Sequence, residues 1–138
     1  MNRNSVLLAT LPEKARNLLR AARIRPIKQG CFINAAKVVL GAGIPKLKYA
    51  EGWVRTLGSA QMFAHAWVIK AGRPIDVTLP ELPEVLTCRR FNPRTVGRIL
   101  FKRKVWGEPL TPELVPARGV YPPYGWPPRM AAERRAAR

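Results

Sequence analysis

Three side chains in this sequence have the types needed for nucleophilic chemistry: Cys31, His65 and Asp76. Cysteine attack on a carbonyl needs a thiolate, a base that holds its proton, and a group that orients the base. His65 is the one histidine of the chain and Asp76 the one aspartate, so each role has an obvious candidate. The set predicts thiol-dependent hydrolysis or acyl transfer at an amide, isopeptide or thioester bond.

The cysteine is expected to stand at the start of a helix. Gly30 interrupts the chain just before it, residues 31–40 carry apolar side chains at helical spacing, and Gly41 ends the pattern. The free N–H groups and the dipole of a helix N-terminus stabilise a thiolate. A cysteine on an apolar helix is more often a small buried hydrophobic residue, so this position alone does not establish reactivity.

The histidine and the aspartate are expected on one β-hairpin. Strand-like segments 64–70 and 73–78 flank the dipeptide at 71–72, which suits a tight two-residue loop. Such a loop fixes the register and places His65 and Asp76 on the same face, diagonally across the ladder, with Cβ atoms ~7 Å apart. A slip of one residue would put them on opposite faces, so the spacing is a specific prediction.

Two more elements are expected before residue 79. The apolar spacing over 10–25 predicts a first helix, with Thr10 as its cap and Glu13 completing a capping box. Alternation over 48–56 predicts another strand. Together with the elements above, they predict an α+β fold in which N-terminal helices pack on a small antiparallel sheet.

The remainder of the chain is less regular. The segment 81–92 is compatible with a short helical turn or a strand, and 93–107 predicts a short basic helix. Between 109 and 128 there are 7 prolines in 20 residues, which favours an extended chain. We therefore expect an α+β core over 1–108 and a Pro-rich, basic C-terminal extension over 109–138.

Four short strings, in order, resemble a known superfamily. They are C-F-x-N-A at Cys31–Ala35, Y-x-E-G at Tyr49–Gly52, H-A-W-V at His65–Val68 and G-x-x-I-D-x-T at Gly72–Thr78. They are similar to the small papain-like, transglutaminase-like cysteine hydrolases of bacteria and phages. The resemblance covers roughly residues 28–80 and implies a papain-like core with the chain order Cys, His, Asp.

The resemblance also implies roles for single residues. Cys31 would be the nucleophile, His65 the base and Asp76 the group that orients the base. Papain-like enzymes often use a glutamine upstream of the cysteine, so Gln29 is the first candidate for a side-chain donor in the oxyanion hole. Asn34 is the alternative, although one turn into the helix it would also be placed to hydrogen-bond only locally.

Aromatic and acidic residues between the motifs are assigned to the surroundings of the site. Trp53 and Trp67 are expected in the core and in the wall of the cleft, rather than in a platform for stacked bases. Glu51 would either line the cleft or pair with Arg55. Cys88 has no second histidine that could act as its base, so it is expected to be structural.

The net charge of +17, from 25 Lys and Arg against 8 Asp and Glu, favours polyanionic partners. The alternative function is therefore a non-catalytic phage, virion or host-directed protein that binds nucleic acid or another polyanion electrostatically, since no motif of a sequence-specific reader is present. The two functions can coexist. The densest basic patch consists of Arg89, Arg90, Arg94, Arg98, Lys102, Arg103 and Lys104.

One histidine and two cysteines are too few for a structural zinc site, and we expect neither a metal nor a cofactor. No apolar stretch reaches transmembrane length, and the N-terminus is a poor signal peptide. We therefore expect no membrane contact and a reduced, cytoplasmic setting in a bacterium or phage-infected cell, or packaging in a virion. The expected substrate is a protein or a small amide.

Overall fold

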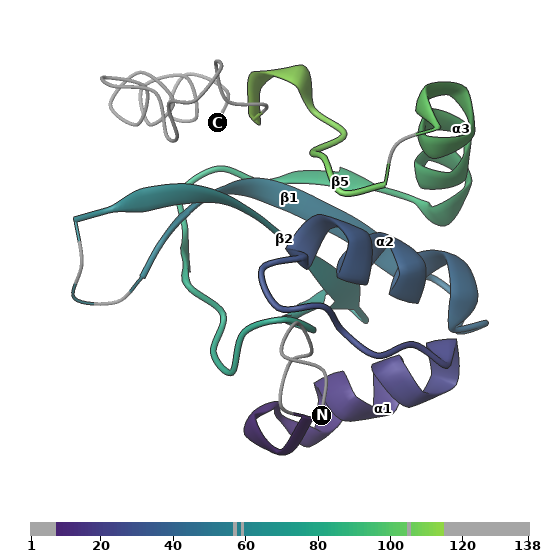
Figure 1. The fold of residues 1–138 in the computed structure, drawn as a ribbon, viewed down its shortest axis with the longest axis horizontal. Coiled ribbons are helices and arrows are strands. Elements are labelled where there is room, and N and C mark those ends of the chain that lie inside the picture. Colours follow the sequence, from purple (N-terminus) through teal and green to yellow (C-terminus); the bar gives the residue numbers. More distant parts are fainter. Residues whose placement is uncertain (1–7, 57, 59, 105, 115–138) are drawn as a thin grey trace.

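The structure is a computed structural model that describes residues 8–56, 58, 60–104 and 106–114 (Figure 1). In these ranges the chain forms three α-helices, two short 3-10 turns and a curled antiparallel sheet, so the predicted α+β class is confirmed. The helices are α1 (Glu13–Ala22), α2 (Cys31–Gly41) and α3 (Pro93–Arg103). The strands are β1 (Lys48–Arg55), β2 (Met62–Lys70), β3 (Arg73–Ile75), β4 (Glu84–Val85) and β5 (Arg89–Phe91).

The sheet is built around the long antiparallel pair β1–β2, which pairs from Lys48 with Ile69 to Arg55 with Met62. Strand β3 flanks β2, and both β4 and β5 pair with β1. The β2–β3 loop has the predicted two residues, Ala71 and Gly72, both with positive φ (52° and 77°). Positive φ at both positions matches the twist of the flanking strands, which explains the tight turn.

A one-residue bulge lies opposite Gly52. Val54 pairs with Val85, and Glu51 pairs with Arg89. Residues 52–53 of β1 are therefore opposite residues 86–88, which contain one residue more. The carbonyl oxygen of Thr87 folds over this point, 1.8 Å from where a Cβ on Gly52 would be. Only glycine therefore fits there. Segment 81–92 contains the strands β4 and β5, so the strand alternative for it is confirmed.

The helix starts and ends follow local hydrogen bonding. The predicted capping box at Thr10 is wrong, because Thr10 ends a 3-10 turn (Leu8–Thr10) and Pro12 occupies the N-cap of α1 with no side-chain cap bond. The helix ends at Ala22, before the predicted boundary, because Arg23 adopts a left-handed conformation (φ 57°) and closes the turn. Helix α2 begins at Cys31, as predicted.

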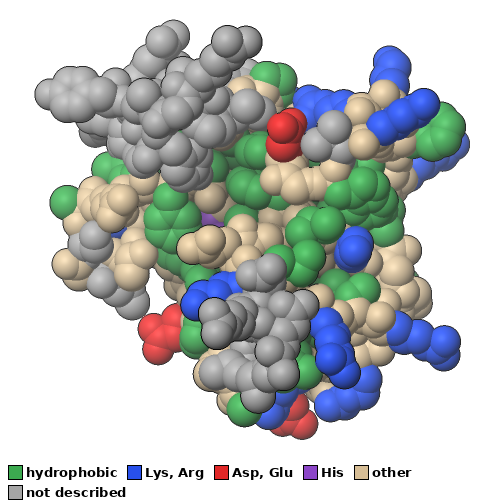
Figure 2. Space-filling view, in the orientation of Figure 1, with side chains coloured by type: hydrophobic (Ala, Val, Ile, Leu, Met, Phe, Trp, Pro, Cys, Tyr) green, Lys and Arg blue, Asp and Glu red, His purple; other side chains and the backbone are tan. Residues whose placement is uncertain are grey.

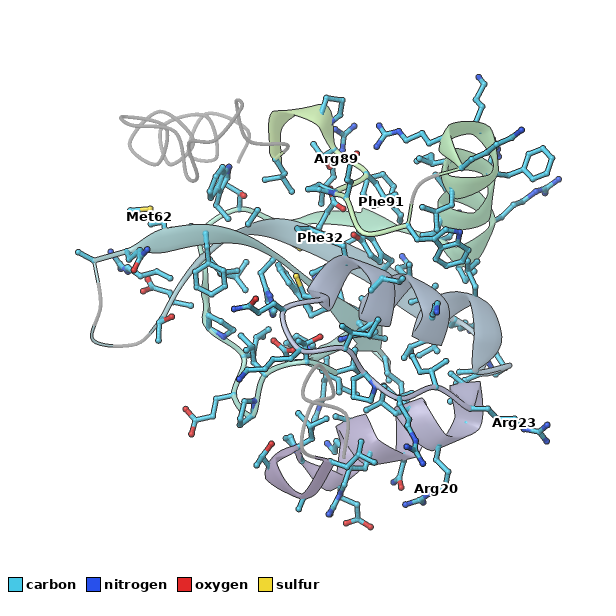
Figure 3. The ribbon with its side chains drawn as sticks, viewed as in Figure 1. Arg20, Arg23, Phe32, Met62, Arg89 and Phe91 are labelled. Atoms are coloured by element: carbon cyan, nitrogen blue, oxygen red, sulfur yellow. The ribbon has the colours of Figure 1, made fainter. Side chains whose placement is uncertain are left out.

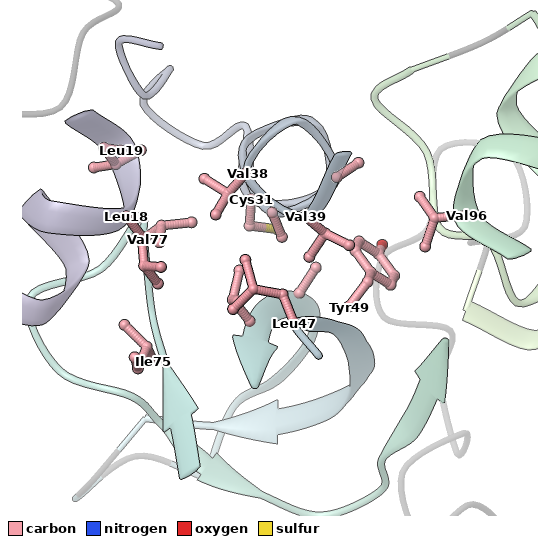
Figure 4. Packing of buried hydrophobic residues seen from close by; sticks show 14 of the residues in the cluster. Leu18, Leu19, Cys31, Val38, Val39, Leu47, Tyr49, Ile75, Val77 and Val96 are labelled. Atoms are coloured by element: carbon pink, nitrogen blue, oxygen red, sulfur yellow. The ribbon is translucent and has the colours of Figure 1, made fainter. Parts of the chain in front are cut away.

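Helix α2 is the centre of the fold: it contacts α1 and α3, and it lies on β1 and β2 (Figure 1). Its inner face packs with α1 and with one face of the sheet in the main core, where Leu18, Val38, Leu47 and Tyr49 are fully buried (Figure 4). Cys31 belongs to this cluster. A smaller cluster around Trp67 covers the other face of the sheet.

The first part of the expected C-terminal extension belongs to the core. Leu110 and Leu114 are buried, and a 3-10 turn (Pro112–Leu114) ends the described chain. The backbone N–H groups of Leu110 and Thr111 donate to the buried carboxylate of Glu51, at 2.8 and 2.6 Å. Residues 109–114 therefore pack as part of the domain, and residues 115–138 of the predicted extension lie outside the described residues.

Candidate active site

The hairpin brings His65 and Asp76 together. Lys70 pairs with Arg73, the predicted register, and His65 Nε2 lies 2.5 Å from Asp76 Oδ2. Both side chains are almost completely buried. The prediction that spacing alone would place these two residues on one face of the sheet is confirmed.

The carboxylate of Asp76 is held on two sides. Its Oδ1 accepts hydrogen bonds from the backbone N–H groups of Thr78 and Leu79, at 2.9 and 2.8 Å, while Oδ2 faces the imidazole. This turn is also why β3 stops at Ile75, three residues before the predicted end. Asp76 therefore both shapes the loop and fixes the orientation of the ring.

Cys31 approaches the same imidazole from α2, and its thiol is one of the groups that raise the pKa of His65. Since Nε2 of the ring faces Asp76, Nδ1 is the nitrogen available to the thiol. Cys31 is 8% exposed and is the first residue of its helix, after Gly30 at the N-cap. The order thiol, imidazole, carboxylate is the arrangement that activates a cysteine nucleophile.

The surroundings of His65 change its proton affinity in both directions. Burial lowers the pKa, but hydrogen bonds with Asp76 and Cys31 and the charges of both partners raise it, with a net increase from 6.5 to about 9. At neutral pH the ring is therefore an imidazolium. Such a ring stabilises a neighbouring thiolate and has a proton to give to a leaving group.

Aromatic side chains on the same strand pack around this ring. Trp67 stacks on His65, with ring centroids 6.2 Å apart and an interplanar angle of 23°. Phe63 approaches from the other side in an edge-on arrangement at 5.8 Å. These contacts restrict the rotation of the imidazole in addition to its hydrogen bond with Asp76.

The two oxyanion candidates have different environments. The amide of Asn34 is fully used: it exchanges two hydrogen bonds with the backbone of Ile27 and donates a third to Thr78, all at 2.9 Å. Asn34 therefore ties the loop before Cys31 to the loop after Asp76. Gln29 is exposed, has a positive φ of 63°, and lines the cavity next to Cys31.

Cys31 and His65 open onto one cavity of about 870 Å³. The single histidine is visible between hydrophobic side chains in the hollow of Figure 2. Most of the wall comes from α2, β2 and the loop after Asp76. The remaining lining residues are Gln29, Phe32, Thr56, Phe63, Ala64, Thr78, Leu79, Pro80, Glu81, Leu82 and Pro83.

The predicted wall residues are elsewhere. Trp53 and Trp67 are buried in the two smaller clusters, and neither lines this cavity. Glu51 is fully buried and accepts hydrogen bonds from Tyr49 and from the 110–111 backbone. The alternative pairing with Arg55 is also wrong, because Arg55 forms its salt bridge with Glu84, at 2.7 Å.

The predicted basic patch is divided among different contacts. The guanidinium of Arg89 lies 5.8 Å from the ring centroid of Phe91 (Figure 3). Arg103 donates to the carbonyl oxygens of Pro109 and Leu110, at 2.9 and 3.0 Å, and so also holds the 109–110 backbone. All seven residues of the predicted patch are exposed: Arg89, Arg90, Arg94, Arg98, Lys102, Arg103 and Lys104.

Cys88 lies on the surface and is not part of the cavity lining. Desolvation raises the pKa of its thiol, although a hydrogen bond and the charge of Arg90 act in the opposite direction. Within the described ranges, no three His, Cys, Asp or Glu side chains are grouped as a metal ion would need. In the same ranges, none of the helices has the length and apolar character to cross a bilayer.

Comparisons with protein-family models, with curated proteins and with solved structures found no significant match to this chain.

Proposed function

We propose that the protein is a thiol-dependent hydrolase or acyltransferase with a papain-like, transglutaminase-like core. The observation that supports this most strongly is the position of His65, which pairs with Asp76 and lines the same cavity of about 870 Å³ as Cys31, whose thiol raises the pKa of the ring. A buried structural cysteine does not require a protonated imidazole beside it, nor an aspartate oriented by two backbone N–H groups.

The proposed reaction begins with the thiolate of Cys31. Its sulfur forms a bond to the carbonyl carbon, and the carbonyl electron pair moves to oxygen, giving a tetrahedral oxyanion. The Cys31 backbone N–H, and Gln29 as the side-chain donor, would stabilise this oxyanion. The imidazolium then gives its proton to the leaving nitrogen or sulfur, the bond to that atom breaks, and an acyl-thioester on Cys31 remains.

The second half of the proposed reaction removes the acyl group from Cys31 and regenerates the free enzyme. His65, now neutral, takes a proton from a water molecule or from an acceptor amine as that group attacks the thioester. Collapse of the second tetrahedral intermediate breaks the carbon–sulfur bond and releases the acid or the new amide. The sulfur leaves as a thiolate beside the imidazolium, which is the starting state. Asp76 keeps the ring oriented and stabilises its positive charge throughout.

A thiol-directed activity probe tests the proposal. Wild-type protein and a Cys88→Ala variant should both be labelled, and a Cys31→Ala variant should lose the labelling that depends on native structure. Urea-unfolded protein serves as the reference for non-specific reaction. Labelling of Cys31→Ala equal to that of the wild type would overturn the proposal.

A second candidate, electrostatic binding of nucleic acid or another polyanion, is favoured by the composition of α3. Helix α3 contains no acidic residue, and Arg94, Arg98 and Lys102 are exposed along it. Binding of this type weakens steeply with salt. A charge-reversed Arg98→Glu/Lys102→Glu variant should bind an oligonucleotide more weakly than the wild type at low salt. Salt-insensitive binding, or none, would remove this candidate.

A further inference from the structure

The cavity next to Cys31 and His65 has mainly apolar walls. Its volume of about 870 Å³ falls within the roughly 300–1,000 Å³ range of sites that bury a drug-sized ligand. Burial of apolar surface is the main source of affinity in such a cavity. The apolar side chains lining it, beyond that of Ala64, are Phe32, Phe63, Leu79, Pro80, Leu82 and Pro83.

The charge inside the cavity contrasts with that of the whole chain. The chain carries +17, yet none of the described residues that line the cavity is Lys or Arg. Its one carboxylate is Glu81, which is exposed and so lies toward solvent. The one cation in the lining is the His65 imidazolium, which Asp76 already neutralises. An anionic substrate group would therefore find no free counter-charge there, and it would be repelled by Glu81.

The net positive charge of the chain and the negative charge of Glu81 would act on a substrate in opposite directions, and the effect of each depends on its distance from the cavity. Interactions between exposed charges are largely screened beyond about 8–10 Å at physiological ionic strength. The exposed cations of α3 lie on an element that does not contribute to the cavity, and Arg55, on β1, is paired with Glu84. Among the described residues that line the cavity, Glu81 is thus the one with an uncompensated charge.

We infer that this cavity selects acyl groups with a large aliphatic or aromatic side chain next to the attacked carbonyl, and prefers Lys or Arg to Asp or Glu at the solvent side. The inference rests on the proposed thiol chemistry of Cys31. It defines the substrate class as apolar peptide segments that carry a basic residue. Glu81 is the residue that sets the charge preference.

The test uses the full chain with Cys88→Ser, so that Cys31 is the one thiol. Three peptidyl acyloxymethyl ketones share a reactive group and differ in the recognition dipeptide: Lys-Phe, Glu-Phe and Lys-Gly, with the second residue adjoining the ketone. The Cys31 thiolate displaces the carboxylate of each probe and forms a thioether, which intact-protein mass spectrometry follows. We expect the Lys-Phe probe to react at least tenfold faster than Lys-Gly. The Lys-Phe probe should react roughly three- to fivefold faster than Glu-Phe, which is the upper part of the range for one exposed charge pair.

Two variants with the same change in net charge test whether Glu81 causes the preference for the Lys-Phe probe over the Glu-Phe probe. Glu81→Gln should bring the Lys-Phe and Glu-Phe rates to within about 1.5-fold of each other. Glu13→Gln makes the same change in net charge at an exposed position on α1, outside the cavity, and should leave the ratio unchanged. A preference that survives Glu81→Gln would overturn the role of Glu81.

Iodoacetamide, which has no recognition group, separates this inference from the proposed function. Rapid alkylation of Cys31 together with equal rates for the three probes, or a preference for Glu-Phe, would overturn the substrate class and leave the thiol chemistry intact. Alkylation of native Cys31 no faster than that of the unfolded chain, with no probe reacting, would overturn both.

Discussion

His65 and Asp76 are 11 residues apart in the chain, and the two-residue turn between their strands places His65 Nε2 2.5 Å from Asp76 Oδ2. The same carboxylate closes the turn that follows β3 through its other oxygen. Orientation of the base and termination of the strand therefore depend on one side chain. This coupling explains why an aspartate is well suited to this position: both of its oxygens are needed.

Replacement of Asp76 by asparagine should lower the pKa of His65 without unfolding the loop. The amide oxygen of the asparagine still accepts from the Thr78 and Leu79 N–H groups, but the negative charge that stabilises the imidazolium is lost. We expect the pKa of His65 to fall from about 9 by roughly one to three pH units. His65 is the single histidine of the chain, so one imidazole signal in proton NMR reports the titration. An unchanged midpoint near pH 9 would show that Asp76 does not control the ring.

The free energy of unfolding should decrease as the pH rises from about 6.5 to above 9. The pKa of His65 is raised from 6.5 to about 9 in the folded protein, so the folded state holds a proton that the unfolded chain releases. The stabilisation is fully present below pH 6.5 and is lost as the pH rises through 9. A shift of this size corresponds to about 3 kcal/mol. Urea denaturation at a series of pH values measures it.

A His65→Gln variant is the control for this pH dependence. Other groups titrate in both proteins, so the difference between their stability curves isolates His65. If the two curves run parallel between pH 6 and 10, the imidazole does not carry the predicted proton.

Substitution of Gly52 by Ala should destabilise the protein by several kcal/mol. The added Cβ would lie 1.8 Å from the Thr87 carbonyl oxygen, so the bulge must move, and Gly52 pairs directly with His65. Gly97→Ala is the matched control: its Cβ meets only Leu40 Cδ2, at 3.6 Å, and alanine should stabilise α3 by about 0.5–1 kcal/mol. Thermal melts of both variants test this pair, and a neutral Gly52→Ala would contradict the close approach at the bulge.

Glu51→Gln should destabilise the protein by about 1–3 kcal/mol. The carboxylate accepts three hydrogen bonds, from Tyr49 and from the backbone of Leu110 and Thr111, and an amide would present N–H to at least one of these donors. Tyr49 stays a donor, because burial, followed by the charge and hydrogen bond of Glu51, raises its pKa well above 10. Glu84→Gln removes only an exposed salt bridge and should cost less than about 1 kcal/mol. Equal losses in the two variants would contradict the structural role of Glu51.

The candidate triad could be predicted because residue types and short sequence motifs indicate where its members lie. One histidine and one aspartate leave no ambiguity of identity, and a tight loop fixes the register on which their contact depends. The start of α2 at Cys31 is likewise marked by Gly30 in the preceding position. These features depend on neighbouring residues or on the residues of a single hairpin.

The cavity wall and the role of Glu51 depend on contacts between distant segments. Glu51 meets backbone groups about 60 residues later in the chain, and nothing in its neighbourhood in the sequence indicates this. The loop of residues 79–83 forms much of the wall, yet its Pro-rich composition indicates only a turn. Trp53 and Trp67 are expected both in the core and in the wall of the cleft, and only the core position is confirmed. Their large apolar rings are buried in the smaller clusters.

The reactivity of Cys31 should depend on His65. In a Cys88→Ser background, the rate of alkylation by iodoacetamide near pH 7 should be at least tenfold higher for the protein with His65 than for His65→Gln, because the imidazolium stabilises the attacking thiolate. Both proteins should show the same rate once unfolded in urea. Equal rates in the two folded proteins would contradict a coupled thiol and imidazole, and with it the proposed chemistry.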